Sequence, residues 1–119
     1  MKSTSEPVSL RWTPGEAIFV RSGELGWMRS HAARPVPLHL HDDVYRVYVS
    51  GRTERNQAQI GYIEVDLEDP AKTLRVSGEP VIRLGGLGAH DESGVTGACV
   101  VRAGDRLYQY YTGWSLMTT

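Results

Sequence analysis

Residues 35–52, PVPLHLHDDVYRVYVSGR, match residues 97–114, GACVVRAGDRLYQYYTGW, at an offset of 62 residues. Each segment reads as a strand, an acidic turn, an aromatic strand and a small-residue exit. Three pairs are identical at this offset: Asp43 and Asp105, Tyr48 and Tyr110, and Gly51 and Gly113. A turn and a strand that coincide at a fixed offset indicate a repeated supersecondary unit.

Two further strands are predicted between the copies, at residues 60–67 and 74–84, the latter interrupted at residues 77–80 by Gly and Pro. No segment has sustained helical periodicity, so the chain is predicted to be nearly all β. Four strands per repeat are typical of a propeller blade. We therefore expect four-stranded antiparallel blades of a five-bladed β-propeller, with blade 1 at about residues 31–84 and a partial blade 2 at about residues 91–116.

The length of the chain limits how much of such a propeller it can form. Five units of this size need about 310 residues, whereas the chain has 119. Residues 1–119 are therefore interpreted as the amino-terminal portion of a single propeller domain, about one and a half blades, with a loose polar start at residues 1–15. An unclosed ring leaves strand edges bare, which predicts self-association through open blade edges.

Composition excludes several classes of partner and compartment. Thirteen basic and fourteen acidic residues leave a net charge of −1 without any Lys/Arg run, which argues against nucleic acid. No apolar run has the length of a membrane span, and no signal peptide is recognisable, so no membrane partner is expected. The single cysteine, Cys99, excludes a disulfide framework and favours a reducing compartment, so the cytoplasm is predicted. Its apolar neighbours predict a buried, inert thiol.

Residues 88–95, GAHDESGV, place two adjacent carboxylates, Asp91 and Glu92, between glycines just before a strand. Glycine allows a close approach of the backbone and unusual dihedral angles, so such a segment can direct an acidic side chain into a cavity. The alternative is a solvated acidic turn.

Five motifs are similar to bacterial glycosidase-like proteins related to glycoside hydrolase families 43 and 32, which are five-bladed propeller enzymes. The resemblance covers about residues 10–116 and rests on residues 27–32 (WMRSHA), 46–52 (RVYVSGR), 60–67 (IGYIEVDL), 91–95 (DESGV) and 110–114 (YYTGW). It implies a funnel-shaped propeller whose inner strands present sugar-binding and catalytic groups to a central pocket. The implied function is a glycoside hydrolase-like protein acting on a carbohydrate, with this fragment inactive alone.

The resemblance assigns the catalytic carboxylate to Asp91, with Glu92 as a weaker candidate for substrate binding because neighbouring side chains in an extended segment point apart. Glycoside cleavage needs two carboxyl groups across the scissile bond. The expected later acid of the family would lie beyond residue 119. The alternative for Asp91 is a turn carboxylate that caps backbone amides.

The resemblance also marks His31, Arg34, Arg52 and Trp114 as substrate-binding candidates. Arg34-Pro35 stands where family 43 enzymes carry an Asp-Pro pair that supplies the general base. Arginine cannot act as a base, but its planar fork suits an anionic sugar, a carboxylate or a phosphate. The alternatives are a core histidine for His31, a surface ion pair for Arg52, and packing between blades for Trp114 and for Trp27.

No metal or cofactor is predicted. His39, His41 and Asp42 lie at a hairpin tip without a further ligand, and residues 85–88 lack the strand–loop–helix context of a phosphate loop. Three functions stay open: a glycoside hydrolase-like propeller, a non-catalytic carbohydrate-binding propeller, or a fragment without independent activity.

Overall fold

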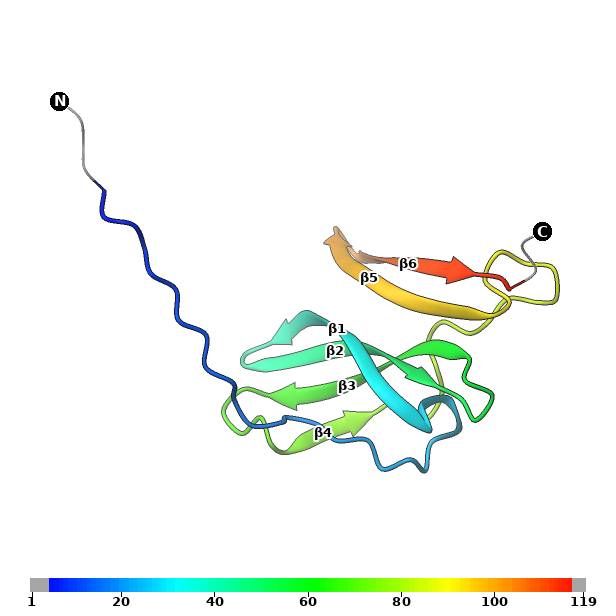
Figure 1. Cartoon of the computed structure of the whole chain (residues 1–119). Helices are drawn as coiled ribbons and strands as arrows, with labels where there is room; N and C mark the ends of the chain where they lie inside the picture. Colours follow the sequence, from blue (N-terminus) through cyan, green and yellow to red (C-terminus); the bar gives the residue numbers. More distant parts are fainter. Residues whose placement is uncertain (1–4, 117–119) are drawn as a thin grey trace.

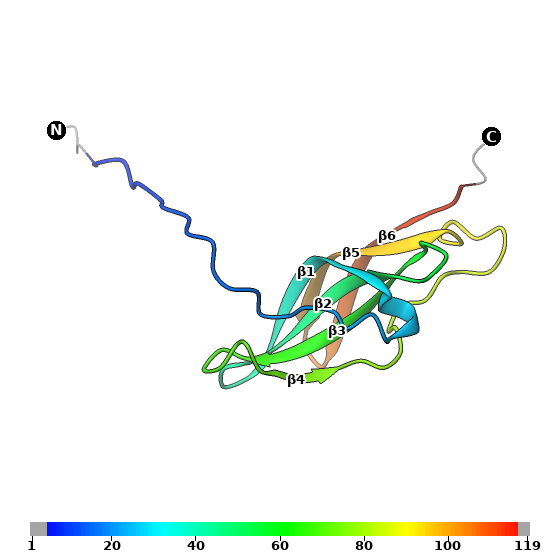
Figure 2. The same cartoon turned by 60° about the horizontal axis from the view of Figure 1, so that its bottom comes forward.

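The computed structural model describes residues 5–116 and confirms that the chain is built from β-strands. Residues 5–25 contain no helix or strand, and the rest of the expected loose start lies outside the described residues. Figure 2 shows the N-terminal segment extending away from the sheet. The elements that follow are η1 (Gly26–Met28), β1 (Ser30–His41), β2 (Val44–Arg52), β3 (Ala58–Asp66), β4 (Thr73–Val76), β5 (Gly94–Ala103) and β6 (Arg106–Trp114) (Figure 1).

Strands β1 to β4 form an antiparallel meander in chain order, which confirms the predicted four-stranded unit. The β-branched and aromatic residues of β2 pair with β3 over the full length of both strands, from Val44 opposite Asp66 to Arg52 opposite Ala58. The fourth strand is shorter than predicted. It ends at Val76, and the chain returns to β3 only through a bridge between Ile60 and Ile82, because the Gly- and Pro-containing segment leaves the ladder between these points.

The sequence repeat is a structural repeat. β1–β2 and β5–β6 are antiparallel hairpins whose two-residue turns lie at the same offset of the sequence. The first turn residue has a left-handed backbone in both hairpins, with φ of 43° at Asp42 and 62° at Gly104. Asp and Gly are residues that adopt this conformation readily.

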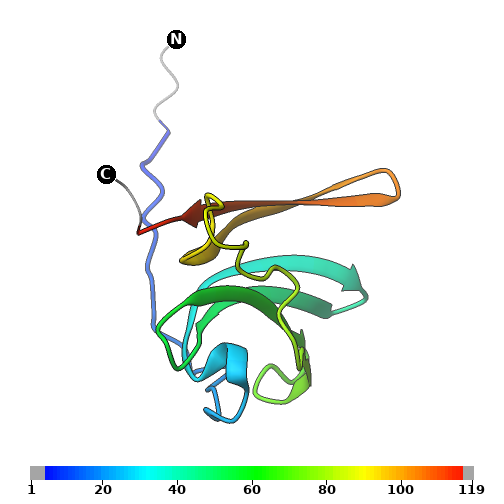
Figure 3. The ribbon, with the colours of Figure 1, turned by 90° about the vertical axis from the view of Figure 1, so that its right-hand side faces the viewer.

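The second hairpin lies across one face of the meander (Figure 1 and Figure 3). A parallel pairing of Ala58 with Gly94 joins β5 to β3, so the six strands form one mixed, open sheet. The described residues therefore form one sheet, and not a blade with a separate partial second blade as the sequence predicted. Within residues 5–116 the sheet does not close into a ring.

A buried apolar cluster holds the hairpin on the meander. Its members come from β1, β2, β3 and β5: Leu38, Tyr48, Ile60, Tyr62 and Val95. The hydroxyl groups of Ser50 and Thr96 lie 2.9 Å apart beside this cluster and join β2 to β5. Complete burial of a Val or Ile side chain contributes about 1.5–3 kcal/mol. The apolar cluster therefore stabilises the hairpin in its position on the meander.

The opposite face of the meander is covered by η1. Trp27 and Met28 are buried there against Val47, Val49, Ile63 and Val65. The Trp27 indole N–H donates to the backbone carbonyl of Ser77 at 2.9 Å, and the Ser77 hydroxyl accepts from the backbone N–H of Tyr62. Trp27 therefore packs within one four-stranded unit, and not between blades as the sequence interpretation had it.

The outer face of β5–β6 is exposed, which corrects the prediction for Cys99. Its thiol is free and exposed, because no other segment within residues 5–116 covers this face. The same hairpin exposes Val101, Leu107, Tyr108 and Tyr110. No helix among the described residues is long and apolar enough to cross a membrane.

Replacement of Gly61 by Ala tests the contact between η1 and the meander. A Cβ at residue 61 would overlap the Trp27 ring and lie 2.7 Å from the Ser77 hydroxyl oxygen. We expect Gly61→Ala to lower the free energy of unfolding by about 1–3 kcal/mol, the usual cost of overpacking. The matched control is Gly78→Ala, whose Cβ would meet nothing within 4 Å. Urea denaturation measures both, and equal stabilities would contradict this packing.

Candidate functional site

A cavity of about 160 Å³ opens where β1 begins and where β2 and β6 end. We call it the strand cavity, because residues of five strands line it: His31, Ala33, Arg34, Ser50, Arg52, Ala58, Thr96 and Trp114. The structure thus brings together His31, Arg34, Arg52 and Trp114, four residues that sequence reasoning had selected separately. Their convergence depends on the hairpin, since Trp114 is on β6 and the other three are on β1 and β2.

Irregularities in β1 direct its side chains into this cavity. The pairing register shifts between Ser30 and Ala33 and again between Ala33 and Val36. His31 and Arg34 have left-handed backbones there, with φ of 61° and 50°. In a regular strand, residues 31 and 34 would face opposite sides of the sheet. Bulges re-orient side chains, and so His31 and Arg34 line the same cavity.

Trp114 is held by the backbone of the neighbouring strand. It pairs with Gly94, and a Cβ at residue 94 would overlap the indole ring. The glycine therefore allows the ring to lie against β5 while the half-buried indole still lines the cavity. Trp114 therefore packs against β5 of its own hairpin and also forms part of the wall of the strand cavity.

A second cavity, of about 480 Å³, adjoins the first and shares Arg52 and Trp114 with it. We call it the loop cavity, because the β2–β3 loop lines much of it. Its remaining residues are Arg55, Asn56, Gln57, Ser93 and Leu116. Its volume lies within the range of about 300–1,000 Å³ found for small-molecule sites.

Arg52 is positioned by this loop. Its Nη1 donates to the Asn56 side-chain oxygen at 3.0 Å, and Asn56 has a left-handed backbone with φ of 61°. Among the described residues the hydrogen bond of Arg52 goes to an amide, and not to the carboxylate that a surface ion pair would need. Sequence reasoning did not select Arg55 and Asn56. The spacing of Arg52 and Arg55 across one tight loop is the signal that could have found them.

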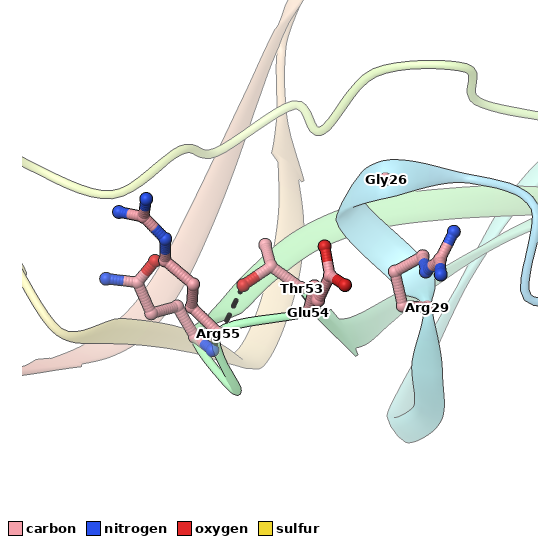
Figure 4. Close-up of a pocket in the computed structure, with 6 residues that line it drawn as sticks. Gly26, Arg29, Thr53, Glu54 and Arg55 are labelled. Carbon is pink, nitrogen blue, oxygen red and sulfur yellow. Dashed lines mark hydrogen bonds between the residues drawn. The ribbon is translucent and has the colours of Figure 1, made fainter.

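A third cavity, of about 360 Å³, lies on the other side of the β2–β3 loop and is lined by Gly26, Arg29, Thr53, Glu54, Arg55 and Gln57 (Figure 4). The backbone N–H of Gln57 donates to the Thr53 hydroxyl at 3.2 Å, which closes this loop. In Figure 4, Glu54 lies between Arg29 and Arg55, whose guanidinium groups point away from one another.

Glu92 lines a further cavity, of about 300 Å³, which shares Gln57 and Ser93 with the loop cavity. The Ser115 hydroxyl donates to Glu92 Oε1 at 2.6 Å, and the backbone N–H of Gly88 donates to Oε2 at 2.5 Å. The bond from Ser115, followed by the bond from Gly88, lowers the pKa of the Glu92 carboxyl, because both stabilise the charged form. Glu92 is therefore a carboxylate at neutral pH.

Asp91 has a different environment from its neighbour. It is 8% exposed and packs where any side chain on Gly85 or Gly113 would collide with it. The Tyr111 hydroxyl donates to Asp91 Oδ2 at 3.1 Å, and this bond raises the pKa of the Tyr111 hydroxyl. Asp91 lines neither the strand cavity nor the loop cavity. Its catalytic role stays a prediction for the complete protein.

The two histidines at the tip of the β1–β2 hairpin, His39 and His41, both contact Asp42 in the adjoining turn. His39 Nε2 lies 2.7 Å from the backbone oxygen of Asp42, and His41 Nδ1 lies 3.2 Å from a carboxylate oxygen of the same residue. Within the described part of the chain, no three His, Cys, Asp or Glu side chains are placed to hold a metal ion.

Comparison with known proteins finds relatives in Mycobacterium tuberculosis. The chain is 46% identical over 110 residues to the uncharacterized proteins MT1551 (strain CDC 1551) and Rv1502 (strain H37Rv). The matched segment is 92% of this chain and spans 37% of the length of these relatives. No protein family model and no solved structure matches the chain.

The hydrogen bond between Asp91 and Tyr111 can be measured by a double-mutant cycle. For Asp91→Ala and Tyr111→Phe we expect a stabilising coupling free energy that is larger than that of the control cycle, because a hydrogen bond to a charged group stabilises more than a neutral one. The control cycle pairs Asp91→Ala with Tyr108→Phe, whose ring is on the exposed outer face. Chemical denaturation gives both couplings, and a value near zero for Tyr111 would mean that Asp91 is not held by it.

Proposed function

We propose that this chain is the amino-terminal part of a glycoside hydrolase-like five-bladed propeller that acts on a carbohydrate. The observation that carries the proposal is the strand cavity. It is lined by His31, Arg34, Arg52 and Trp114, the residues that the motif resemblance assigns to substrate binding. Residues selected for one role by sequence motifs are thus neighbours in space, although the chain separates them by up to 83 positions.

The arrangement of strands supports the propeller part of the proposal. A four-stranded antiparallel meander is followed by a repeated hairpin that packs on its face through a buried apolar cluster. Blades of a propeller are repeated four-stranded sheets of this kind. Lengths are also compatible: 110 residues are 37% of the relatives, so these have about 300 residues, close to the roughly 310 that five units need.

The cavity has the groups that bind sugars. An indole ring offers an apolar face with a polar edge, and arginine and histidine side chains donate hydrogen bonds to hydroxyl oxygens. In the complete protein, Asp91 remains the proposed catalytic carboxylate, and Glu92 is a second acid beside the loop cavity. Hydrolysis by two carboxyl groups would then require a partner acid from another blade, and this chain alone is proposed to be inactive.

A non-catalytic carbohydrate-binding propeller is the second candidate, and one observation favours it. Arg34 stands at the position of the expected general base and lines the strand cavity, which has no Asp or Glu in its wall. Arginine binds anions and hydroxyl groups but does not abstract protons.

The cytoplasm stays the proposed compartment. Self-association through open blade edges also stays part of the proposal, and sedimentation velocity over a concentration series checks it.

Carbohydrate binding is tested with two tryptophan variants. We expect the chain to bind members of a glycan array. We also expect Trp114→Ala to weaken that binding by about threefold to tenfold in calorimetric titration, since contacts with an aromatic ring contribute about 0.5–1.5 kcal/mol. The control is Trp12→Ala, because Trp12 is 89% exposed in the extended N-terminal segment. Absence of any glycan binding, or equal binding by both variants, would contradict the proposed site.

A further inference from the structure

The strand cavity and the loop cavity together form a basic surface without a carboxylate. Three arginines, Arg34, Arg52 and Arg55, line the two cavities with His31. No Asp or Glu lines either of them. The whole chain has a net charge of −1. The positive charge of this surface therefore comes from its own residues and not from an overall excess of basic residues.

Of the arginines in the described residues, only Arg46 and Arg83 are paired with acids. Arg46 binds Glu64 at 2.7 Å through Nη2 and also through Nε, and Arg83 binds Glu79 at 2.7 Å. Within residues 5–116, none of the three cavity arginines forms an ion pair. The hydrogen bond from Arg52 to Asn56 uses only one of the five N–H donors that a guanidinium group has.

The acids Glu54, Glu92 and Asp91 form no ion pair with the three cavity arginines. Glu54 and Arg55 both line the third cavity, but within residues 5–116 no ion pair joins them, and the Arg55 guanidinium points away from the side where Arg29 lies (Figure 4). Glu92 already accepts hydrogen bonds from Gly88 and Ser115, and Asp91 is buried with Tyr111. The donors of Arg34, Arg52 and Arg55 therefore remain available to a ligand.

The backbone around the cavities is held in an unfavourable conformation. His31, Arg34 and Asn56 are three of the four non-glycine residues with positive φ among the described residues. The fourth, Asp42, is in a hairpin turn. Left-handed backbone at non-glycine residues has an energetic cost and is concentrated at ligand sites. At residues 31 and 34 it coincides with the bulges that bring the side chains of β1 into the strand cavity.

We propose that the two cavities bind an oxyanion, a carboxylate or phosphate group, carried by the carbohydrate. The inference rests on the proposed function and specifies its substrate class. Guanidinium groups bind carboxylate and phosphate through two parallel charge-assisted hydrogen bonds. Trp114, which both cavities share, provides the surface for the sugar ring beside the anion.

Titration calorimetry of the whole chain tests this with three probes: glucuronate, glucose and inorganic phosphate. We expect glucuronate to bind at least about tenfold more tightly than glucose, which corresponds to about 1.4 kcal/mol. Arg34→Gln, Arg52→Gln and Arg55→Gln should each remove most of this difference, because each weakens the binding of glucuronate more than the binding of glucose. The matched control is Arg106→Gln, which removes an exposed arginine at the β5–β6 turn.

The outcomes separate this inference from the function on which it rests. Phosphate binding that depends on the same arginines supports an oxyanion site and identifies phosphate as a sufficient group. Equal affinities for glucose and glucuronate overturn the inference but leave carbohydrate binding intact. Anion binding that the cavity variants lose no more than Arg106→Gln also overturns it. If none of the probes binds, the anion site is wrong, and the glycan array then decides separately about carbohydrate.

Discussion

The contact between the β5–β6 hairpin and the β1–β4 meander is the interaction on which the rest of the structure depends. It is made by five buried residues, of which Val95 and Ile60 are 0% and 1% exposed. Tyr48 and Tyr62 meet edge to face in the same cluster, and the Arg46 guanidinium lies 4.1 Å from the centre of the Tyr62 ring. Apolar burial of this kind has no direction of its own. The hydrogen bond between Ser50 and Thr96 and the pairing of Ala58 with Gly94 therefore define the register of the hairpin.

The functional consequence is the shape of the site. β6 is joined to β1 and β2 by a long stretch of chain, so only the packed hairpin brings Trp114 beside Arg34 and Arg52. The site also separates its charges. Arginines line the two cavities. The acids Asp91 and Glu92 lie in the segment before β5, where Asp91 accepts a hydrogen bond from Tyr111 and Glu92 accepts hydrogen bonds from Gly88 and Ser115. Under the proposed function, this chain would present a binding surface, and hydrolysis would need acids from other parts of the complete protein.

Much of the fold could be predicted from local patterns. The alternation of β2 and the repeated acidic turn were sufficient to place both hairpins, because strand pairing and turn chemistry are local. The sequence also selected His31, Arg34, Arg52 and Trp114, which line one cavity, and their role in binding stays a prediction. The break after Val76 was recognised, but the short length of β4 was not, since propensity does not show where a ladder loses its partner. The prediction of a buried Cys99 was wrong, because an apolar run does not indicate whether a second layer covers it.

The parts that could not be predicted depend on long-range geometry. Pro35 indicates an edge strand or a bulge, but the bulges that place His31 and Arg34 on one cavity depend on how β1 pairs with β2. Arg55 becomes a site residue only through the fold of its loop beside Trp114. The burial of Asp91 follows from Gly85 and Gly113, which lie on either side of it in the sequence and leave room for its side chain.

The central claim is that the hairpin packs on the meander and so completes the cavity. Nuclear Overhauser contacts of the Val95 methyl groups in a dilute solution of the chain measure this directly. The structure predicts contacts to side chains of the cluster on β2 and β3, namely Tyr48, Ile60 and Tyr62. Contacts of Val95 limited to its own hairpin would show that β5–β6 is not seated there, and the account of the site would be wrong.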